Sequence, residues 1–228
     1  FDTKELKQLG KDFPSSSLMF AKFSEDNQFV AYVQDFNIYK ENFKTGEITQ
    51  LTKDGTGDII NGTFDWVYEE EFGMRDGFTW SPDASKIAFW QLDASDIGTF
   101  YMINNTDSVY SQPIALQYPK AGYNPSSAKV GIVDTKTSEI KWIPMPGDPV
   151  QHYLPAMQWL SEDLLLIQQM NRKQNQLNIF TYKPSTAELK KVYTETEDTW
   201  VDLRYPDISS NQWGNNDQLI VDNGKAFL

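Results

Sequence analysis

The stretch Trp80-Ser-Pro-Asp-Ala-Ser-Lys-Ile-Ala-Phe89 decides the fold class. An aromatic residue ends one strand, a Ser-x-Asp sequence forms the turn, and an apolar run begins the next strand. The same shape occurs in Phe23-Ser-Glu-Asp-Asn-Gln-Phe-Val-Ala-Tyr32 and in Trp159-Leu-Ser-Glu-Asp-Leu-Leu-Leu-Ile167, and in a degenerate form over residues 208–220. The sequence therefore predicts a repeated β-hairpin.

A second kind of hairpin alternates with the first. Its three copies each consist of a strand, a short polar turn and another strand, at residues 37–51, 131–143 and 178–192. Two alternating hairpins give four strands per repeat, and repeats of ~40–50 residues with four short strands are typical of β-propeller blades. An antiparallel β-sandwich built from hairpins is the alternative that this pattern leaves open.

The spacing of the repeats predicts two insertions and an incomplete propeller. The intervals from Phe23 to Trp80 and from Trp80 to Trp159 both exceed the ~40–50 residues of a bare blade. We expect the insertions at residues 65–75 and 93–118. Residues 1–228 are then an all-β propeller fragment of about three whole and two partial four-stranded blades, with one short inserted helix.

Composition argues against several classes of function. The 228 residues carry 32 acidic and 20 basic side chains, a formal charge of −12, and an acidic surface repels the phosphates of nucleic acids. The chain has no cysteine and one histidine, which excludes disulfides, thiol catalysis and cysteine-based metal sites. The longest apolar run, residues 29–33, is far shorter than the ~20 residues of a membrane-spanning helix. We expect no nucleic acid, membrane span, metal or cofactor.

One stretch breaks the β pattern. The sequence Phe64-Asp-Trp-Val-Tyr-Glu-Glu-Glu-Phe72 predicts a helix with Asp65 as its N-cap. The three consecutive carboxylates fall in the first turns, where the helix dipole favours negative charge. Adjacent like charges raise one another's pKa when they are partly buried, so the run beside Trp and Tyr indicates a bound cation. A solvated acidic turn is the alternative.

Residues 61–72, Asn-Gly-Thr-Phe-Asp-Trp-Val-Tyr-Glu-Glu-Glu-Phe, closely resemble the double-glutamate segment of the dipeptidyl peptidase IV family. Members of this family are serine exopeptidases of the prolyl oligopeptidase clan. Residues 78–89 resemble the strand that follows that segment, and Tyr118-Pro-Lys-Ala-Gly122 resembles a second family motif in its expected order. The resemblance runs through most of the chain and is sharpest between residues 58 and 125.

The resemblance implies the N-terminal part of an eight-bladed propeller that covers an α/β-hydrolase domain. It also implies that Glu70 and Glu71 hold the free α-amino group of a peptide substrate, with Glu69 as the next candidate. A peptide amine has a pKa of ~7.7–8.0 and is largely cationic at neutral pH. Two carboxylates can accept charge-assisted hydrogen bonds from its three N–H donors. Fixing the amine determines which bond reaches the nucleophile, so N-terminal dipeptides are released.

The catalytic residues of the family are expected outside this chain. The family's nucleophile lies in a Gly-x-Ser-x-Gly turn, and residues 1–228 contain no such pentapeptide. The family's catalytic His and Asp belong to the hydrolase domain, and we interpret His152 as structural or exposed. The fragment alone is therefore expected to be inactive and to contribute amine recognition and one cavity wall to a larger enzyme.

Two further segments are candidates by resemblance. Residues 200–206 resemble a family stretch that borders the distal part of the substrate cleft, which makes Arg204 and Tyr205 candidate wall residues. Packing at the beginning of a blade is the other interpretation of these two side chains. The insertion at residues 93–118 resembles an extended hairpin arm that takes part in homodimerisation. Its exposed aromatic residues either meet a partner or pack back onto their own blade.

Three functions are open from the sequence. The first is a propeller segment of a dipeptidyl-peptidase-like enzyme, and the second is a catalytically silent propeller that acts as a protein-interaction module. The third is an oligopeptidase or acylaminoacyl peptidase of the same clan, which the glutamate run disfavours because those enzymes need no free amine. The lack of cysteine favours an exported bacterial protein, in the periplasm or outside the cell.

Overall fold

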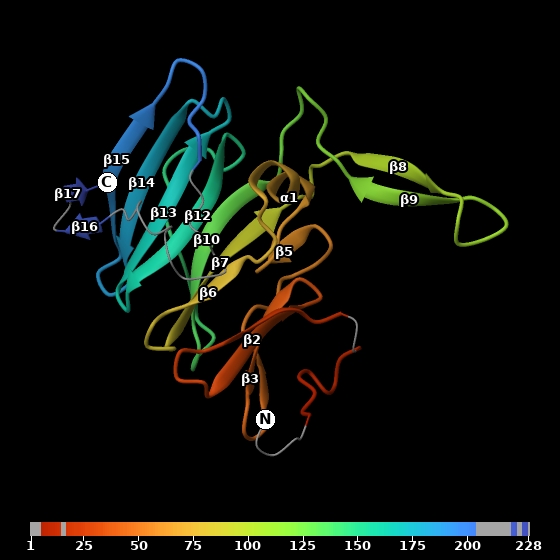
Figure 1. Cartoon of the computed structure of the whole chain (residues 1–228), viewed down its shortest axis with the longest axis horizontal. Coiled ribbons are helices and arrows are strands. Elements are labelled where there is room, and N and C mark those ends of the chain that lie inside the picture. Colours follow the sequence, from red (N-terminus) through yellow and green to blue (C-terminus); the bar gives the residue numbers. More distant parts are fainter. Residues whose placement is uncertain (1–5, 15–16, 204–219, 223–224, 228) are drawn as a thin grey trace.

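The computed structural model describes residues 6–14, 17–203, 220–222 and 225–227. These residues form three antiparallel sheets that succeed one another along the chain, together with one short helix and two isolated hairpins (Figure 1). Buried apolar side chains fill the space between neighbouring sheets. The predicted all-β fold with one short helix is confirmed for this part of the chain.

The first and third sheets are simple meanders, in which each strand pairs with the next one along the chain. The first sheet consists of β1 (Met19–Phe23), β2 (Phe29–Gln34), β3 (Asn37–Asn42) and β4 (Ile48–Gln50). The third sheet consists of β12 (His152–Ser161), β13 (Leu164–Asn171), β14 (Gln176–Lys183) and β15 (Glu188–Thr196). A separate hairpin consists of β16 (Ile220–Asp222) and β17 (Lys225–Phe227). Four-stranded sheets were predicted, and these two sheets confirm them.

The second sheet has five strands, because the strand at one edge is divided in two. Its members are β5 (Ile59–Asn61), β6 (Phe78–Trp80), β7 (Lys86–Asp93), β10 (Ser127–Asp134) and β11 (Ile140–Trp142). β5 pairs with the end of β7 and β6 pairs with its beginning. Together they occupy the edge that β1 and β12 occupy in the other sheets.

Two insertions interrupt the second sheet. Helix α1 (Trp66–Phe72) lies between β5 and β6, within the predicted residues 65–75. The hairpin of β8 (Thr99–Asn104) and β9 (Gln112–Gln117) lies between β7 and β10, within the predicted residues 93–118. We call this hairpin the arm. In Figure 1 the arm leads away from the three sheets.

The turn that repeats in the sequence also repeats in its hydrogen bonds. Between β1 and β2, Ser24 Oγ donates to Asp26 Oδ1 at 2.6 Å, and the backbone N–H of Ser24 donates to the carbonyl of Phe29. Between β6 and β7, Ser81 Oγ donates to Asp83 Oδ1, also at 2.6 Å. The Ser-x-Asp sequence therefore sets the register of both hairpins by the same local chemistry.

The second hairpin type is closed by a side-chain acceptor at its first turn residue. Asn42 Oδ1 accepts two backbone N–H groups at 2.9 and 3.0 Å, and Asp134 Oδ1 accepts two at 2.8 Å. Four residues later, Gly46 and Ser138 have positive φ angles of 73° and 59°, which bring the chain back into the next strand.

Tryptophan side chains join neighbouring sheets at equivalent positions. Trp80 Nε1 in β6 donates to the carbonyl of Lys22 in β1 at 3.2 Å, and Trp159 Nε1 in β12 donates to the carbonyl of Thr79 in β6 at 3.3 Å. Each acceptor directly precedes the repeat's aromatic residue in the previous sheet. The same bond therefore places each sheet on the one before it.

Two expectations about the extent of the fold have different outcomes. The helix is shorter than residues 65–75, because Gly73 adopts a left-handed φ of 62° and ends it. The fourth copy of the repeat, residues 208–220, lies almost entirely outside the described residues. The described sheets do not close into a ring, so the propeller and its number of blades stay predictions.

Candidate functional site

Both ends of helix α1 are fixed by local hydrogen bonds. At the N-terminus, Asp65 Oδ1 accepts the backbone N–H of Tyr68 at 3.2 Å, as an N-cap does. At the C-terminus, the backbone N–H of Gly73 donates to the carbonyl of Tyr68, and the left-handed Gly73 turns the chain toward β6. The sequence therefore folds locally into a single short helix that begins and ends near the edge of the second sheet.

One face of α1 is buried against aromatic side chains. Tyr68 and Phe72 are 0% and 3% exposed. The ring of Tyr68 stacks on Phe64 with the centroids 5.3 Å apart, and the ring of Phe72 lies 4.9 Å from Tyr153 of β12. Burial of such a side chain stabilises by roughly 1.5–3 kcal/mol, so this packing holds the helix between the second and third sheets.

The three glutamates of α1 differ in their surroundings. Glu69 is half-buried, and its Oε2 lies 3.4 Å from Nη2 of Arg75. Glu70 and Glu71 are exposed, and neither forms an ion pair with a residue in the described parts of the chain. Two adjacent carboxylates with free acceptor oxygens can bind a cationic donor through charge-assisted hydrogen bonds.

Tyr153 of β12 lies near the end of α1, and the charge of Arg172, in the turn after β13, acts on its hydroxyl. Burial raises the pKa of the Tyr153 hydroxyl, the positive charge of Arg172 lowers it, and the negative charge of Glu71 raises it. Arg172 is itself held, because its Nη2 donates to the carbonyl of Tyr123 at 3.3 Å.

The second sequence motif, which begins at Tyr118, packs against α1. The ring of Tyr118 lies 4.3 Å from the ring of Trp66, the first residue of the helix. Just after this motif, Ser126 Oγ donates to Asp65 Oδ2 at 2.7 Å. Burial raises the pKa of the Asp65 carboxyl, while its hydrogen bonds lower it. The two segments that carry the family resemblance are therefore in contact.

The predicted site residues have different outcomes. Glu70 and Glu71 are consecutive and exposed on α1, and the amine-binding role assigned to them stays a prediction. Arg204 and Tyr205 lie outside the described residues. His152 is 6% exposed with its Nδ1 3.2 Å from Nε2 of Gln169, so it is a buried structural residue. Sequence reasoning missed Tyr153 and Arg172, because no local motif links them to α1.

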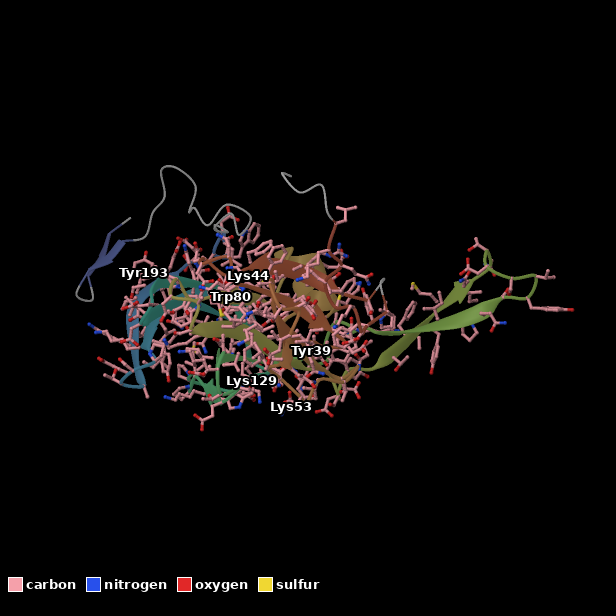
Figure 2. The ribbon with its side chains drawn as sticks, turned by 90° about the horizontal axis from the view of Figure 1, so that it is seen from below. Tyr39, Lys44, Lys53, Trp80, Lys129 and Tyr193 are labelled. Atoms are coloured by element: carbon pink, nitrogen blue, oxygen red, sulfur yellow. The ribbon has the colours of Figure 1, made fainter. Side chains whose placement is uncertain are left out.

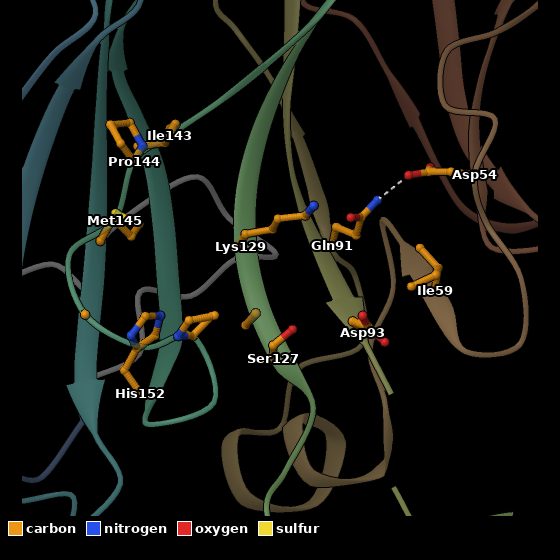
Figure 3. A pocket seen from close by; sticks show the side chains of 13 residues that line it. Asp54, Ile59, Gln91, Asp93, Ser127, Lys129, Ile143, Pro144, Met145 and His152 are labelled. Carbon is orange, nitrogen blue, oxygen red and sulfur yellow. Dashed lines mark hydrogen bonds between the residues drawn. The ribbon is translucent and has the colours of Figure 1, made fainter. Parts of the chain in front are cut away.

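A cavity of about 430 Å³ lies between the second and third sheets (Figure 3), and none of the three glutamates of α1 lines it. It is lined by residues that include Gln91 and Lys129 of the second sheet and His152 of the third, and by no residue of α1. Gln91 Nε2 already donates to Asp54 Oδ2 at 2.9 Å, and Lys129 Nζ lies 4.0 Å from the ring centroid of Trp142. Because these polar groups are engaged within the protein, we assign no substrate to this cavity.

No group of three or more His, Asp or Glu side chains in the described residues is placed to hold a metal ion. The helix in this part of the chain is too short to cross a membrane. Location in the periplasm or outside the cell stays a prediction, and the exposed glutamates of α1 are the candidate site.

Comparison with known proteins identifies the family. Residues 1–223 match the model of the dipeptidyl peptidase IV (DPP IV) N-terminal region. The chain belongs to the dipeptidyl peptidase IV family. It is 27% identical over 241 residues to a putative dipeptidyl aminopeptidase of Schizosaccharomyces pombe, a match that covers 97% of this chain and 29% of that protein. It is 29% identical over 195 residues to inactive dipeptidyl peptidase 10 of Rattus norvegicus, covering 82% of this chain and 24% of that protein.

The structural comparison agrees with the sequence comparison. The crystal structure of Porphyromonas gingivalis dipeptidyl peptidase 4 matches with a TM-score of 0.77 and 30% identity, over 81% of this chain and 26% of that one. The resemblance first seen in residues 61–72 is therefore confirmed. The chain spans less than a third of the length of each of these relatives.

Proposed function

We propose that this chain is the propeller segment of a dipeptidyl-peptidase-IV-like serine exopeptidase, in which Glu70 and Glu71 bind the free N-terminal amine of a peptide substrate. The proposal is carried by one observation, the pair of adjacent exposed carboxylates on a helix packed between two sheets. A helix fixed in this way can hold its charges at a constant distance from a reacting centre. Each sheet is then a propeller blade, and an α/β-hydrolase domain elsewhere in the same polypeptide supplies the catalytic residues.

Electrostatics favours an amine over a neutral group at this position. A peptide N-terminus is largely cationic at neutral pH, and hydrogen bonds from it to carboxylates are roughly twice as strong as neutral ones. The formal charge of −12 adds a field that attracts cations. Binding energy at the amine places the peptide bond after the second residue next to the nucleophile. N-terminal dipeptides are therefore released.

Alanine substitutions in the complete enzyme test this role. Glu70→Ala and Glu71→Ala should each lower kcat/KM on a dipeptide-linked reporter by at least about 30-fold (~2 kcal/mol), because each removes one partner of a charged hydrogen bond. Neither should affect turnover of the N-acetylated reporter, which has no cationic amine. Glu69→Ala is the matched control, because Glu69 already pairs with Arg75, and its effect should be smaller.

Two results would contradict the assignment. Equal turnover of the free and acetylated reporters by the unmodified enzyme would exclude an amine anchor. A loss from Glu69→Ala as large as those from the other two substitutions would show that the binding pair is shifted by one residue.

The alternative function is a catalytically silent propeller that serves as a protein-interaction module. It is supported by the similarity over 82% of this chain to a protein named inactive dipeptidyl peptidase 10. The two functions differ in whether the complete polypeptide keeps a nucleophile. A Gly-x-Ser-x-Gly turn in the rest of the polypeptide, together with hydrolysis of the dipeptide reporter, would decide for the enzyme.

We also propose that the arm contributes to a homodimer of the complete protein. Tyr101 and Ile103 of β8 are 64% and 71% exposed, and the arm extends away from the body in a second view (Figure 2). Packing back onto the chain's own sheet would have covered these side chains. An apolar hairpin that its own chain leaves uncovered suits the same surface of a second copy.

A further inference from the structure

A β-bulge in β12 leaves the backbone of one residue of the third sheet, Leu154, without its usual partners. One extra residue of β12 lies between two of its pairs with β13, Tyr153 with Met170 and Ala156 with Gln168. Within this interval Pro155 has no N–H, and Leu154 is completely buried. A buried N–H and C=O need hydrogen-bond partners, so those of Leu154 must be supplied from outside the sheet.

Two aromatic side chains, from the second sheet and its helix, form hydrogen bonds to the backbone of Leu154. The backbone N–H of Leu154 donates to the hydroxyl oxygen of Tyr68 at 3.1 Å, and Trp90 Nε1 donates to the carbonyl of Leu154 at 2.9 Å. The ring of Phe64 lies 5.3 Å from that of Tyr68 and 5.2 Å from that of Trp90. The three rings form one packed unit that contacts the third sheet at Leu154.

The hydroxyl of Tyr68 accepts the hydrogen bond from Leu154, whereas its ring packs against the neighbouring aromatic rings. Tyr68 is completely buried, and burial raises the pKa of its hydroxyl, so the group stays neutral. Phenylalanine would fill the same space. It would leave the buried N–H of Leu154 without an acceptor, and an unsatisfied buried donor is costly enough to displace the helix or the strand.

We propose that Tyr68 is a positioning residue for amine recognition. Its bond to Leu154 fixes α1 against the third sheet and thereby sets the position of Glu70 and Glu71, which follow Tyr68 within one helical turn. The inference rests on the proposed amine-binding role of these two glutamates. It adds that the position of the carboxylates depends on a hydroxyl that touches no substrate.

The test compares two tyrosine-to-phenylalanine variants of the complete enzyme. Tyr68→Phe removes the acceptor of the Leu154 N–H. The matched control is Tyr182→Phe, because Tyr182 is 2% exposed and lies on β14, two strands away from β12. For each enzyme, kcat/KM is measured on a free-amine dipeptide reporter and on its N-acetylated form, and the ratio of the two values is the readout.

We expect Tyr68→Phe to lower this ratio by about tenfold, since a small displacement of a positioned group has effects of that order. Turnover of the acetylated reporter should stay within about twofold, and Tyr182→Phe should leave the ratio unchanged. If Tyr68 has only a structural role, both kcat/KM values will fall in proportion and the ratio will not move. That result would overturn the inference.

Amide hydrogen exchange provides a second readout. The Leu154 N–H should exchange at least about tenfold faster in Tyr68→Phe than in Tyr182→Phe, because it loses its acceptor. Equal exchange rates would also overturn the inference. If Tyr68→Phe does not fold, Trp90→Phe removes the other side-chain bond to the backbone of Leu154 and should also lower the ratio. An unchanged ratio in that variant would then decide against the inference.

The glutamate variants separate this inference from the proposed function. If Glu70→Ala and Glu71→Ala leave the ratio unchanged, amine binding by α1 is wrong and the role of Tyr68 is wrong with it. If the glutamate variants lower the ratio while Tyr68→Phe leaves it unchanged, only the positioning role is wrong.

Discussion

The two insertions of the second sheet have opposite relations to the rest of the protein. Helix α1 buries three side chains, Val67, Tyr68 and Phe72, between its own sheet and the next. The arm instead exposes the apolar side chains along β8, which are Phe100, Tyr101, Met102 and Ile103. Figure 1 shows α1 beside the sheets and the arm leading away from them.

This difference indicates what each insertion can do. An insertion that is packed on two sides has its side chains directed by the protein itself, so a charge on it stays in place for a ligand. An insertion that its own chain leaves uncovered offers apolar surface to a partner. Changes in α1 should therefore affect stability and substrate recognition, whereas changes in the arm should affect association.

The largest expected effect comes from truncating an aromatic residue in each insertion. Phe72→Ala should lower the free energy of unfolding by about 3–5 kcal/mol, because Phe72 is 3% exposed and its removal leaves a cavity. Tyr101→Ala should change it by less than about 0.5 kcal/mol, because the side chain is 64% exposed. Urea unfolding of the complete protein at a concentration low enough to keep it monomeric measures both, because association then adds nothing to the free energy of unfolding. Similar losses in the two variants would show that the arm is packed as firmly as the helix.

The next effect concerns association. Replacing Tyr101 and Ile103 together by Ser should weaken a homodimer by at least about tenfold, because exposed aromatic and apolar anchors dominate interface energies. Sedimentation velocity over a concentration series measures the shift to monomer. The matched control is Leu6→Ser, which removes an exposed apolar side chain outside the arm and should leave the dimer unchanged. The proposed role of the arm would be contradicted if the unmodified protein were a monomer, or if the arm substitutions left the dimer unchanged.

Local chemistry explains what the sequence could predict. The Ser81–Asp83 turn depends on residues within a few positions of one another. The Asp65 cap likewise requires only a bond to Tyr68, three residues along the chain. The aromatic flanks of the glutamate run indicated a packed helix, and Phe72 is indeed buried.

Contacts between distant residues explain what the sequence could not predict. Tyr68 and Leu154 are 86 positions apart, and their bond depends on a bulge that only the assembled third sheet creates. Hydrophobic periodicity records which face of a strand is buried but not where an extra residue is accommodated. The repeated aromatic position was visible in the sequence, whereas the indole bond that Trp159 makes to the neighbouring sheet was not.

The smallest expected effect is a change of stability with pH that arises in α1. Asp65 holds α1 in place through Ser126 and is itself buried, and burial raises the pKa of its carboxyl above the ordinary 3.8. The folded protein therefore keeps this proton more readily than the unfolded chain. As the pH rises from 3.8 through the raised pKa, ionisation of Asp65 lowers the stability of the fold, and below 3.8 this cost is absent.

Asp65→Asn keeps a capping oxygen and removes the ionisation. The quantity to compare is the free energy of unfolding of Asp65→Asn minus that of the unmodified protein. This difference should increase as the pH rises above 3.8 and should level off once Asp65 is ionised in both the folded and the unfolded state. The total increase should be about 1.4 kcal/mol for each unit by which the pKa is raised. Asp107→Asn, which replaces an exposed carboxyl in the tip of the arm, is the control. Urea unfolding between pH 3 and pH 8 measures both variants. A difference that falls as the pH rises would mean that hydrogen bonds outweigh burial at Asp65, and that the ionised cap stabilises α1.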